Sequence, residues 1–320
     1  MNYLIGYLFF DRINIQAANA ISSPLTYGFP AITGFLGAIH ALNRKLSNDK
    51  PLSFDGVLDG VLIACHDYQL KSFRAHPYAD YTFNQTRNPL KKRNSVYQSP
   101  PIIEEGKIDL TVSLLIEIKG NSDTYDWLEK EENQLAFQKE MKKQLMQQRI
   151  AGGSVSPPRL PQHKHVNYFD RDVSDNELKS KLLPAFVLMH AKQELIQLTD
   201  ELQQSNPEKT GMDALIETAM LHHCPKENEH GQITWHSENI KSGHGWLVPI
   251  PIGFQAIAAP FDPGILTSCR NPEYRSQYVE SVYSLGKWVF PHSLGDTLEN
   301  CFWRYSHPEP PFYLVTQSSQ

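Results

Sequence analysis

Hydrophobic residues in this chain occur in two patterns. Some form short continuous runs, and others, between the runs, recur every three or four residues, as on one face of a helix. Residues 3–10, 57–65 and 108–118 are near-continuous apolar runs, short enough to be buried strands. Between the first two runs, a helix is predicted to begin near Pro30, the favoured type of residue for a first helical turn. Its apolar face, with positions three and four residues apart, consists of Phe35, Ile39, Leu42 and Leu46.

A second long helix is predicted after the third strand. It is capped by Asn121 or Ser122, and its apolar stripe consists of Phe137, Met141 and Leu145. The pair Gly152–Gly153 is predicted to end this helix. The order strand, helix, strand, excursion, strand, helix is typical of half a ferredoxin-like sheet, and it is also compatible with other α+β folds.

The rest of the chain divides into a connector, a helical region and a region of strands. Residues 154–172 are rich in proline, residues 212–223 are a shorter helix, and residues 245–313 resemble strands and ordered loops. Between the connector and the shorter helix, Pro184 opens a helical stretch whose apolar stripe is predicted to consist of Leu188, Ala191, Leu195, Leu198 and Leu202. The sequence thus predicts an α+β protein. Its expected parts are a core at 1–172 with a basic excursion at about 71–107, a helical insertion at 173–225, and a β-rich part at 226–320 that completes the core.

Charge and cysteine content restrict the class of protein. The net charge of −5 argues against a general nucleic-acid coat, because counterion release requires clustered cations, but it leaves room for a local basic patch. The four cysteines are scattered without a C-x-x-C pair, which favours free thiols in a reducing compartment. The start of the chain lacks the pattern of a signal peptide, and no apolar run is long enough to span a bilayer. We therefore expect a cytoplasmic protein without a membrane segment.

The sharpest local feature is a cationic stretch at residues 87–93. Its candidate RNA-binding residues are Arg87, Asn88, Lys91, Lys92 and Arg93. Aromatic residues are interleaved around it at Tyr78, Tyr81, Phe83 and Tyr97. Cations neutralise phosphates while aromatic faces stack on unpaired bases, as in proteins that hold single-stranded RNA. A solvated basic loop with buried aromatic anchors is the alternative.

Two further segments could bind phosphate. The first lies directly before the first predicted helix, and its candidate residues are Asn19, Ser22, Ser23 and Thr26. The second is the glycine pair with the arginine before it, and its candidate residues are Arg149, Gly152 and Gly153. N-capping and turn formation explain the first segment equally well, and simple helix termination explains the second.

No motif predicts catalysis, a metal or a cofactor. Six histidine and cysteine residues fall between His222 and His244, but they lack the paired short spacings of a zinc site. The common nucleotide, hydrolase and protease motifs are missing from the sequence. A metal-independent ribonuclease would leave no sequence signature, and His76, next to the basic excursion, is its best candidate residue. We expect no bound metal, no cofactor and no catalytic residue.

Several stretches, in collinear order over nearly the whole chain, resemble the second Csy subunit of type I-F CRISPR systems, a Cas-five-type member of the RAMP superfamily. The matching stretches are residues 13–42, 83–94, 102–117, 149–155, 182–189, 245–257, 278–294 and 302–305. Any one of them would be weak, and together they are specific.

The resemblance implies an RRM-like (ferredoxin-like) RAMP core with a protruding thumb and an inserted helical module. It also implies a subunit that clamps the 5′ handle of the guide RNA together with the large Csy subunit, beside the repeated backbone subunit, and supports recognition of target DNA. It implies no nuclease activity. The alternative is a metal-independent endoribonuclease that processes CRISPR repeat RNA. On this interpretation the RNA contacts are expected on the loop before the first helix, the basic excursion and the Gly-Gly turn.

Overall fold

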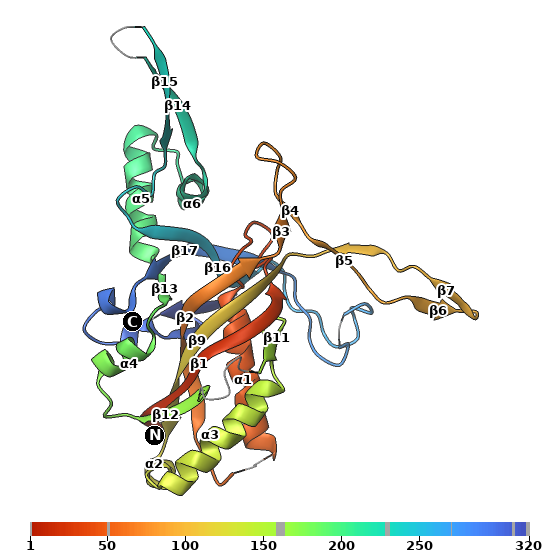
Figure 1. Ribbon diagram of the computed structural model, residues 1–320, viewed down its shortest axis with the longest axis vertical. Coiled ribbons are helices and arrows are strands. Elements are labelled where there is room, and N and C mark those ends of the chain that lie inside the picture. The colour runs from red at the N-terminus through yellow and green to blue at the C-terminus, as the bar shows by residue number, and fades with distance from the viewer. Residues whose placement is uncertain are drawn as a thin grey trace. The chain divides into compact units, whose positions relative to one another are not determined.

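A computed structural model describes residues 2–49, 52–157, 164–227, 231–269, 271–308 and 311–317. The chain forms two compact units, residues 1–185 and residues 186–320. Each unit combines an antiparallel sheet with helices (Figure 1). The prediction of an α+β protein is therefore confirmed.

The first unit is built on a sheet of long central strands. Its strand order is β10-β11-β1-β9-β2, every neighbouring pair is antiparallel, and β12 pairs with the other end of β1. Its elements, apart from those of the excursion, are β1 (Tyr3–Asn19), α1 (Ile32–Asp49), β2 (Val57–Leu70), β9 (Lys107–Gly120), α2 (Ser122–Leu128), α3 (Glu131–Met146), β10 (Arg149–Ile150), β11 (Gly153–Ser156), β12 (Val166–Asp170) and α4 (Asp175–Lys181).

The predicted apolar faces of the first unit form its core. In α1 and α3 the stripes predicted from residue spacing are buried, and their members are Phe35, Ile39, Leu42, Leu46, Phe137, Met141 and Leu145. The middle of β9 is buried on both faces, as its apolar run indicates.

Strand β1 is longer than predicted, because it continues to Asn19, well past residue 10, where the predicted apolar run ends. Arg12 and Ala17 adopt positive φ angles of 44° and 53°, and the pairing of β1 with β9 shifts register around each of them. Such bulges absorb a residue and keep the following side chains on the inner face. Ile13 and Ile15 consequently stay buried.

The predicted long helix after β9 is two helices. Asn121 caps α2, since its Oδ1 accepts a hydrogen bond from the Thr124 N–H at 2.9 Å. The chain then leaves the helical conformation at Lys130 (φ −80°, ψ 122°), where α3 begins. Helix α3 ends at Met146, so Gly152 and Gly153 do not end it, and the prediction that they do was wrong.

Residues 154–172 were predicted to be a simple connector, but they contain two strands of the sheet. Strand β11 pairs with one end of β1 and β12 with the other, and the proline-rich residues 158–163 between them lie outside the described residues. Val155 and Val166 are buried, so these short strands extend the core beside β1.

Between β2 and β9 the chain leaves the sheet and projects from the first unit (Figure 1). Residues 72–83 form a small hairpin, β3 (Ser72–Phe73) and β4 (Thr82–Phe83). Residues 84–104 form a longer hairpin, which we call the arm. Its strands are β5 (Gln85–Arg87), β6 (Lys91–Arg93), β7 (Val96–Gln98) and β8 (Ile102–Glu104), with β5 paired to β8 and β6 to β7.

The strands of the second unit lie in the order β13-β17-β16-β19-β18, and β14 and β15 form a separate hairpin. Its elements are β13 (Phe186–His190), α5 (Lys192–Ser205), α6 (Gly211–Ala219), β14 (His222–Glu227), β15 (Ile233–Glu238), β16 (Trp246–Ala256), β17 (Val279–Val289), β18 (Trp303–Ser306) and β19 (Phe312–Gln317), with 3-10 turns at Pro291–Ser293 and Glu299–Cys301. The strands expected within residues 245–313 are thereby confirmed.

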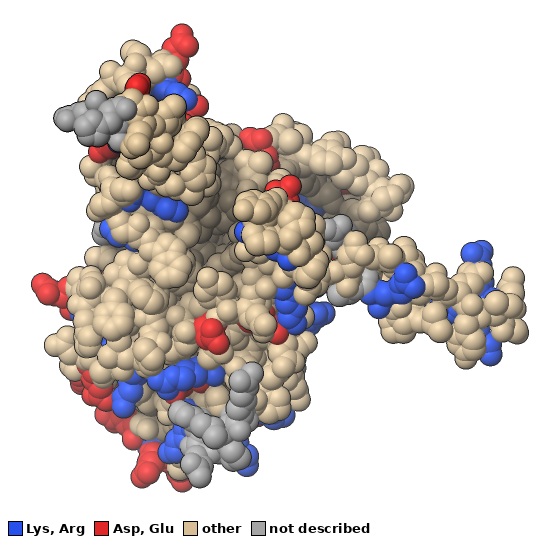
Figure 2. All heavy atoms as spheres, turned by 45° about the horizontal axis from the view of Figure 1, so that its top comes forward, with Lys and Arg blue, Asp and Glu red and all other residues tan. Residues whose placement is uncertain are grey.

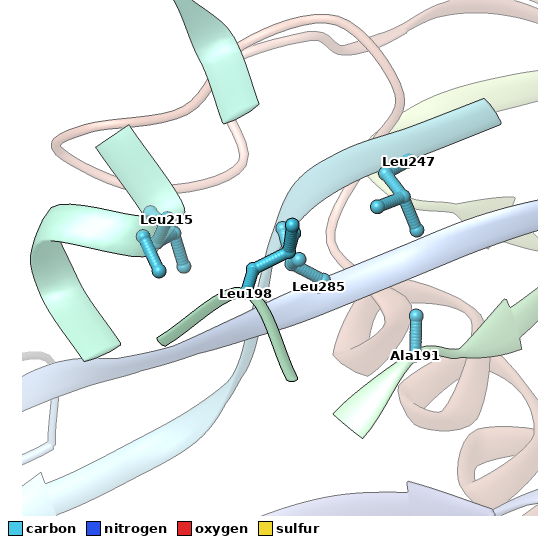
Figure 3. Close-up of a cluster of buried hydrophobic side chains, with 6 residues drawn as sticks. Ala191, Leu198, Leu215, Leu247 and Leu285 are labelled. Atoms are coloured by element: carbon cyan, nitrogen blue, oxygen red, sulfur yellow. The ribbon is translucent and has the colours of Figure 1, made fainter. Parts of the chain in front are cut away.

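Helices α5 and α6 pack on β16 and β17 through a cluster of small and branched side chains (Figure 3). The cluster consists of Ala191, Leu198, Ala214, Leu215, Leu247 and Leu285. Leu188 was predicted to share the helical stripe of α5, but it lies in β13, where Phe186–His190 pair with β17. Consecutive branched and aromatic residues favour a strand there, and the helix begins only at Lys192.

Protonation of His190 is expected to destabilise the second unit at acidic pH. Burial is the main cause that lowers the pKa of His190 to about 4, from its ordinary value of 6.5, and its Nε2 lies 2.9 Å from Ser284 Oγ. As the pH falls, His190 therefore becomes protonated near pH 6.5 in the unfolded chain but only near pH 4 in the folded chain. This side chain alone should lower the free energy of unfolding by about 3 kcal/mol between pH 7.5 and pH 4.

Urea denaturation across this pH range checks the effect. His190→Gln should flatten the pH dependence, whereas His40→Gln, a substitution of an exposed histidine on α1, should leave it unchanged. An equally steep pH dependence in the His190 variant would contradict the assignment.

Candidate nucleic-acid interface

The tip of the arm is a tight hairpin turn. Asn94 and Ser95 connect β6 to β7 with φ angles of 47° and 64°. Positive φ at both central residues is characteristic of a type I′ turn, whose backbone twist matches that of the two strands it connects. Asparagine adopts positive φ more readily than most residues. The sequence therefore fixes the register in which Lys91, Lys92 and Arg93 are presented.

The cations of β6 point alternately to the two faces of the arm. Lys92 is paired across the strands with Tyr97, and its Nζ lies 5.9 Å from the centre of the tyrosine ring. Lys91 and Arg93 emerge on the opposite face, since side chains alternate along a strand. Arg87, nearer the base, donates a hydrogen bond to Ser99 Oγ at 3.0 Å. All of these residues are exposed, and so is Asn88.

The arm is strongly positive in a protein that is negative overall. Residues 84–103, which make up the arm without its last residue, Glu104, contain four cations and no Asp or Glu. In Figure 2 the arm extends to the right with blue Lys and Arg atoms and no red carboxylates. Among the described residues no ion pair involves these four cations; ion pairs occur at the base, where Lys71 meets Asp109 at 2.9 Å and Lys107 meets Glu105 at 2.7 Å. The cations of the arm are thus available to an external anion.

The loop before α1 is closed by its own hydroxyl groups. Thr26 Oγ1 lies 2.7 Å from the Oγ atoms of both Ser22 and Ser23, and the Thr26 N–H donates to Ser23 Oγ at 3.1 Å. None of these side chains caps α1, which begins six residues after Thr26, at Ile32. The hydroxyls therefore shape a tight, partly exposed turn, which was the alternative interpretation of this segment.

The glycine pair lies in a second tight turn, between β10 and β11. Ala151 and Gly152 adopt φ angles of 48° and 79°, and Ile150 pairs with Gly153 across the turn. The Asn19 N–H donates to Ala151 O at 2.9 Å, so this turn contacts the end of β1. Arg149 Nη2 donates to Gly152 O at 2.6 Å, which holds the guanidinium over the turn.

Contacts also join the loop before α1 to the base of the excursion. The Tyr27 and Phe83 rings meet edge to face at 5.6 Å, and the Ala20 N–H donates to Gly106 O at 2.9 Å. The structure thus brings together three segments that lie far apart in the sequence: the loop, the Gly-Gly turn and the base of the excursion. The cluster from Arg87 to Arg93 is not part of this group, because it lies farther out along the arm (Figure 1).

The small hairpin carries the residues considered for catalysis. The Arg74 guanidinium lies 5.1 Å from the centre of the Tyr81 ring, and Arg74 also donates to backbone carbonyls at Pro77 and Ala79. Arg74 thereby closes the loop that carries His76. The imidazole of His76 is exposed, and the described residues supply it with no hydrogen-bonding partner.

A serine–histidine pair that sequence reasoning missed lies inside the first unit. His66 Nε2 is 2.7 Å from Ser113 Oγ, and its Nδ1 is 2.8 Å from Pro184 O. Burial lowers the pKa of His66, and Ser113 has no accessible surface. A hydroxyl without access cannot reach a substrate, so we interpret the pair as part of the polar network that also joins Arg12 N–H to Ser113 Oγ at 2.9 Å. No spacing in the sequence could have revealed it.

The histidine-rich segment of the second unit is spread over the hairpin of β14 and β15. His222 Nε2 contacts Glu217 Oε2 at 2.7 Å, and His223 Nδ1 contacts Ser237 Oγ at 3.1 Å. Within the described ranges no three His, Cys, Asp or Glu side chains are grouped so that they could hold a metal ion. His230 lies outside the described residues. The absence of a structural metal stays a prediction.

Fold and interface together define a class: an α+β protein with a long arm whose residues 84–103 carry four cations and no carboxylate. The family model for CRISPR-associated protein (Cas_Csy2) matches residues 8–315. A CRISPR-associated protein Csy2 from Pseudomonas aeruginosa (strain UCBPP-PA14) is 33% identical over 318 residues, which cover 95% of this chain and 92% of that protein. The chain belongs to the Csy2 family, the second Csy subunit of type I-F CRISPR systems, and the resemblance is confirmed. In the described part of the chain, no helix combines the length and apolar character needed to cross a membrane.

Proposed function

We propose that this chain is a non-catalytic RNA-binding subunit of a type I-F CRISPR interference complex. It clamps the 5′ handle of the guide RNA together with the large Csy subunit. It also contacts the repeated backbone subunit and supports recognition of target DNA, in the cytoplasm. The observation that carries the proposal is the arm: four exposed cations without a carboxylate at residues 84–103, in a protein of net charge −5.

We also propose that the first unit is an RRM-like (ferredoxin-like) RAMP core. Its elements follow the order β1, α1, β2, β9, α3, β11, and its strands lie in the order β11-β1-β9-β2. An antiparallel sheet with this connectivity is a split βαβ arrangement, in which the third strand lies between the first two. In the ferredoxin-like scheme the arm is an insertion between the second and third core strands.

The loop before α1, the Gly-Gly turn and the base of the excursion form a second part of the proposed interface. Asn19 ties the first two together, while Arg149 places a guanidinium beside Gly152. Backbone and amide groups can hold a folded RNA backbone there, while the arm contributes cations farther out.

Binding without cleavage is the expected result when the purified chain, together with the large Csy subunit, meets labelled CRISPR repeat RNA. A single-turnover incubation in EDTA, with protein in excess, should give a stable complex and intact RNA. Metal-free cleavage requires a base near the attacking 2′-hydroxyl and an acid near the leaving oxygen, and His76 has no such partner among the described residues.

The variant His76→Ala separates the two functions. Site-specific cleavage that disappears in this variant would show that the protein is a metal-independent endoribonuclease and would refute the non-catalytic assignment. Cleavage that persists unchanged in the variant and is traced to a contaminating nuclease would leave the non-catalytic assignment standing.

A further inference from the structure

Helix α6 in the second unit is apolar around nearly its whole circumference. Its nine residues, Gly211–Ala219, include only two charged side chains, Asp213 and Glu217. A helix of this kind is normally covered on all sides. Its environment is therefore informative.

Only one face of α6 is covered. Ala214, Leu215 and Thr218 are buried, and the helix contacts α5 and β16 through this face (Figure 3). The hydroxyl of Thr218 donates a hydrogen bond to Leu215 O at 2.7 Å, so this buried polar group is satisfied within α6 itself.

The outer face is an exposed apolar stripe. Met212, Ile216 and Met220 follow one another at a spacing of four residues, and their exposed fractions are 42%, 47% and 42%. Leu221 extends the stripe and is 58% exposed. The end of the stripe is held in place, because Asn239 Nδ2 donates a hydrogen bond to Met220 O. A contiguous row of large apolar side chains on a fixed backbone is typical of a surface that binds a partner.

The surroundings of the stripe are acidic. Residues 192–221 contain six carboxylates, at Glu194, Asp200, Glu201, Glu208, Asp213 and Glu217, against two cations, Lys192 and Lys209. Three of the six already have partners: Asp213 pairs with Lys209 at 3.4 Å, Glu194 pairs with Lys287 at 3.1 Å, and Glu217 contacts His222 Nε2 at 2.7 Å. Asp200, Glu201 and Glu208 are exposed. An acidic surround repels nucleic acid and a second copy of the same surface, and it attracts a cationic partner.

We propose that the stripe of Met212, Ile216, Met220 and Leu221 is a docking surface for a basic amphipathic helix of a protein partner. The apolar face of that helix covers the stripe, and its lysines or arginines meet the surrounding carboxylates. The stripe belongs to the second unit and the proposed RNA contacts to the first, and the inference does not depend on RNA binding.

A synthetic helix tests the proposal on the full-length chain. The probe is a labelled leucine–lysine peptide of about 18 residues, or five turns, with leucines on one face. A scrambled peptide of the same composition has the same charge but no apolar face. We expect fluorescence anisotropy to show about tenfold tighter binding of the amphipathic peptide, a preference that the triple variant Met212→Asn, Ile216→Asn, Met220→Asn abolishes.

Matched controls make the result specific. Ile257 and Ile265 are exposed isoleucines of the same unit, with exposed fractions of 61% and 63%, and the double variant Ile257→Asn, Ile265→Asn should keep the preference. The single variant Ile216→Asn serves if the triple variant has a lowered melting temperature. Equal binding of the two peptides by the unaltered chain would overturn the proposal.

Two other occupants are distinguished in the same experiment. Concentration-dependent dimerisation that the variant abolishes would assign the stripe to a second copy. A loss of RNA affinity in the variant would assign it to nucleic acid. Either result would refute the proposed partner, whereas failure of the unaltered chain to bind handle RNA would refute only the proposed RNA-binding function.

Discussion

Replacing Arg87, Lys91, Lys92 and Arg93 together by alanine is expected to weaken binding of handle RNA by about 100-fold near physiological salt. Each cation that contacts a phosphate releases counterions from single-stranded RNA, with about 0.7 units of log–log salt slope per contact. Losing four contacts should flatten the slope by about 3 units. Affinities at several salt concentrations measure both effects.

A second set of four cations provides the control. Lys130, Lys139, Lys142 and Lys143 lie at the start of α3 or along it and are exposed. Replacing these four by alanine changes the net charge by the same amount but leaves the arm intact. If this control weakens binding as much as the arm variant does, the effect comes from net charge and the arm is not a specific contact.

The sequence predicts those parts of the fold in which local pattern and burial agree. The stripes of α1 and α3 and the buried middle of β9 could be located from periodicity, because each is covered by the same unit along its whole length. Periodicity failed where the backbone departs from regular geometry. Nothing in the residue types at Arg12 and Ala17 signals a positive φ, so the continuation of β1 could not be seen.

The same limit applies to the interface. The cations of the arm were visible in sequence because four of them occur within seven residues. The contact between Asn19 and the turn at Ala151 was not, since hydrogen bonds between distant turns leave no spacing signal. Leu188 shows the reverse error: its helical spacing from Leu195 was fortuitous, and pairing with β17 decides its conformation.

Gly153→Ala is expected to destabilise the first unit much more than Gly152→Ala. A methyl group on Gly153 would lie 2.6 Å from Ile15 Cγ2, and 2.8 Å from both Ala18 N and Gln16 O. Two of these atoms belong to the backbone of β1, so the strand itself must move, at a cost of about 3 kcal/mol in the free energy of unfolding. A methyl group on Gly152 meets Asn19 Cβ only at 3.8 Å, and its cost of about 1 kcal/mol comes from the positive φ of 79°.

Denaturant unfolding of both variants, with handle-RNA affinity measured in parallel, tests this difference and the proposed interface at once. Gly153→Ala should lose stability and RNA affinity together, because it separates the turn from β1. Gly152→Ala should stay folded, so any loss of affinity in this variant reports directly on the approach of RNA to the turn. Equal destabilisation by the two substitutions would contradict the close packing of Gly153 against β1. Unchanged RNA affinity in both variants would remove the turn from the interface and leave the arm as its principal contact.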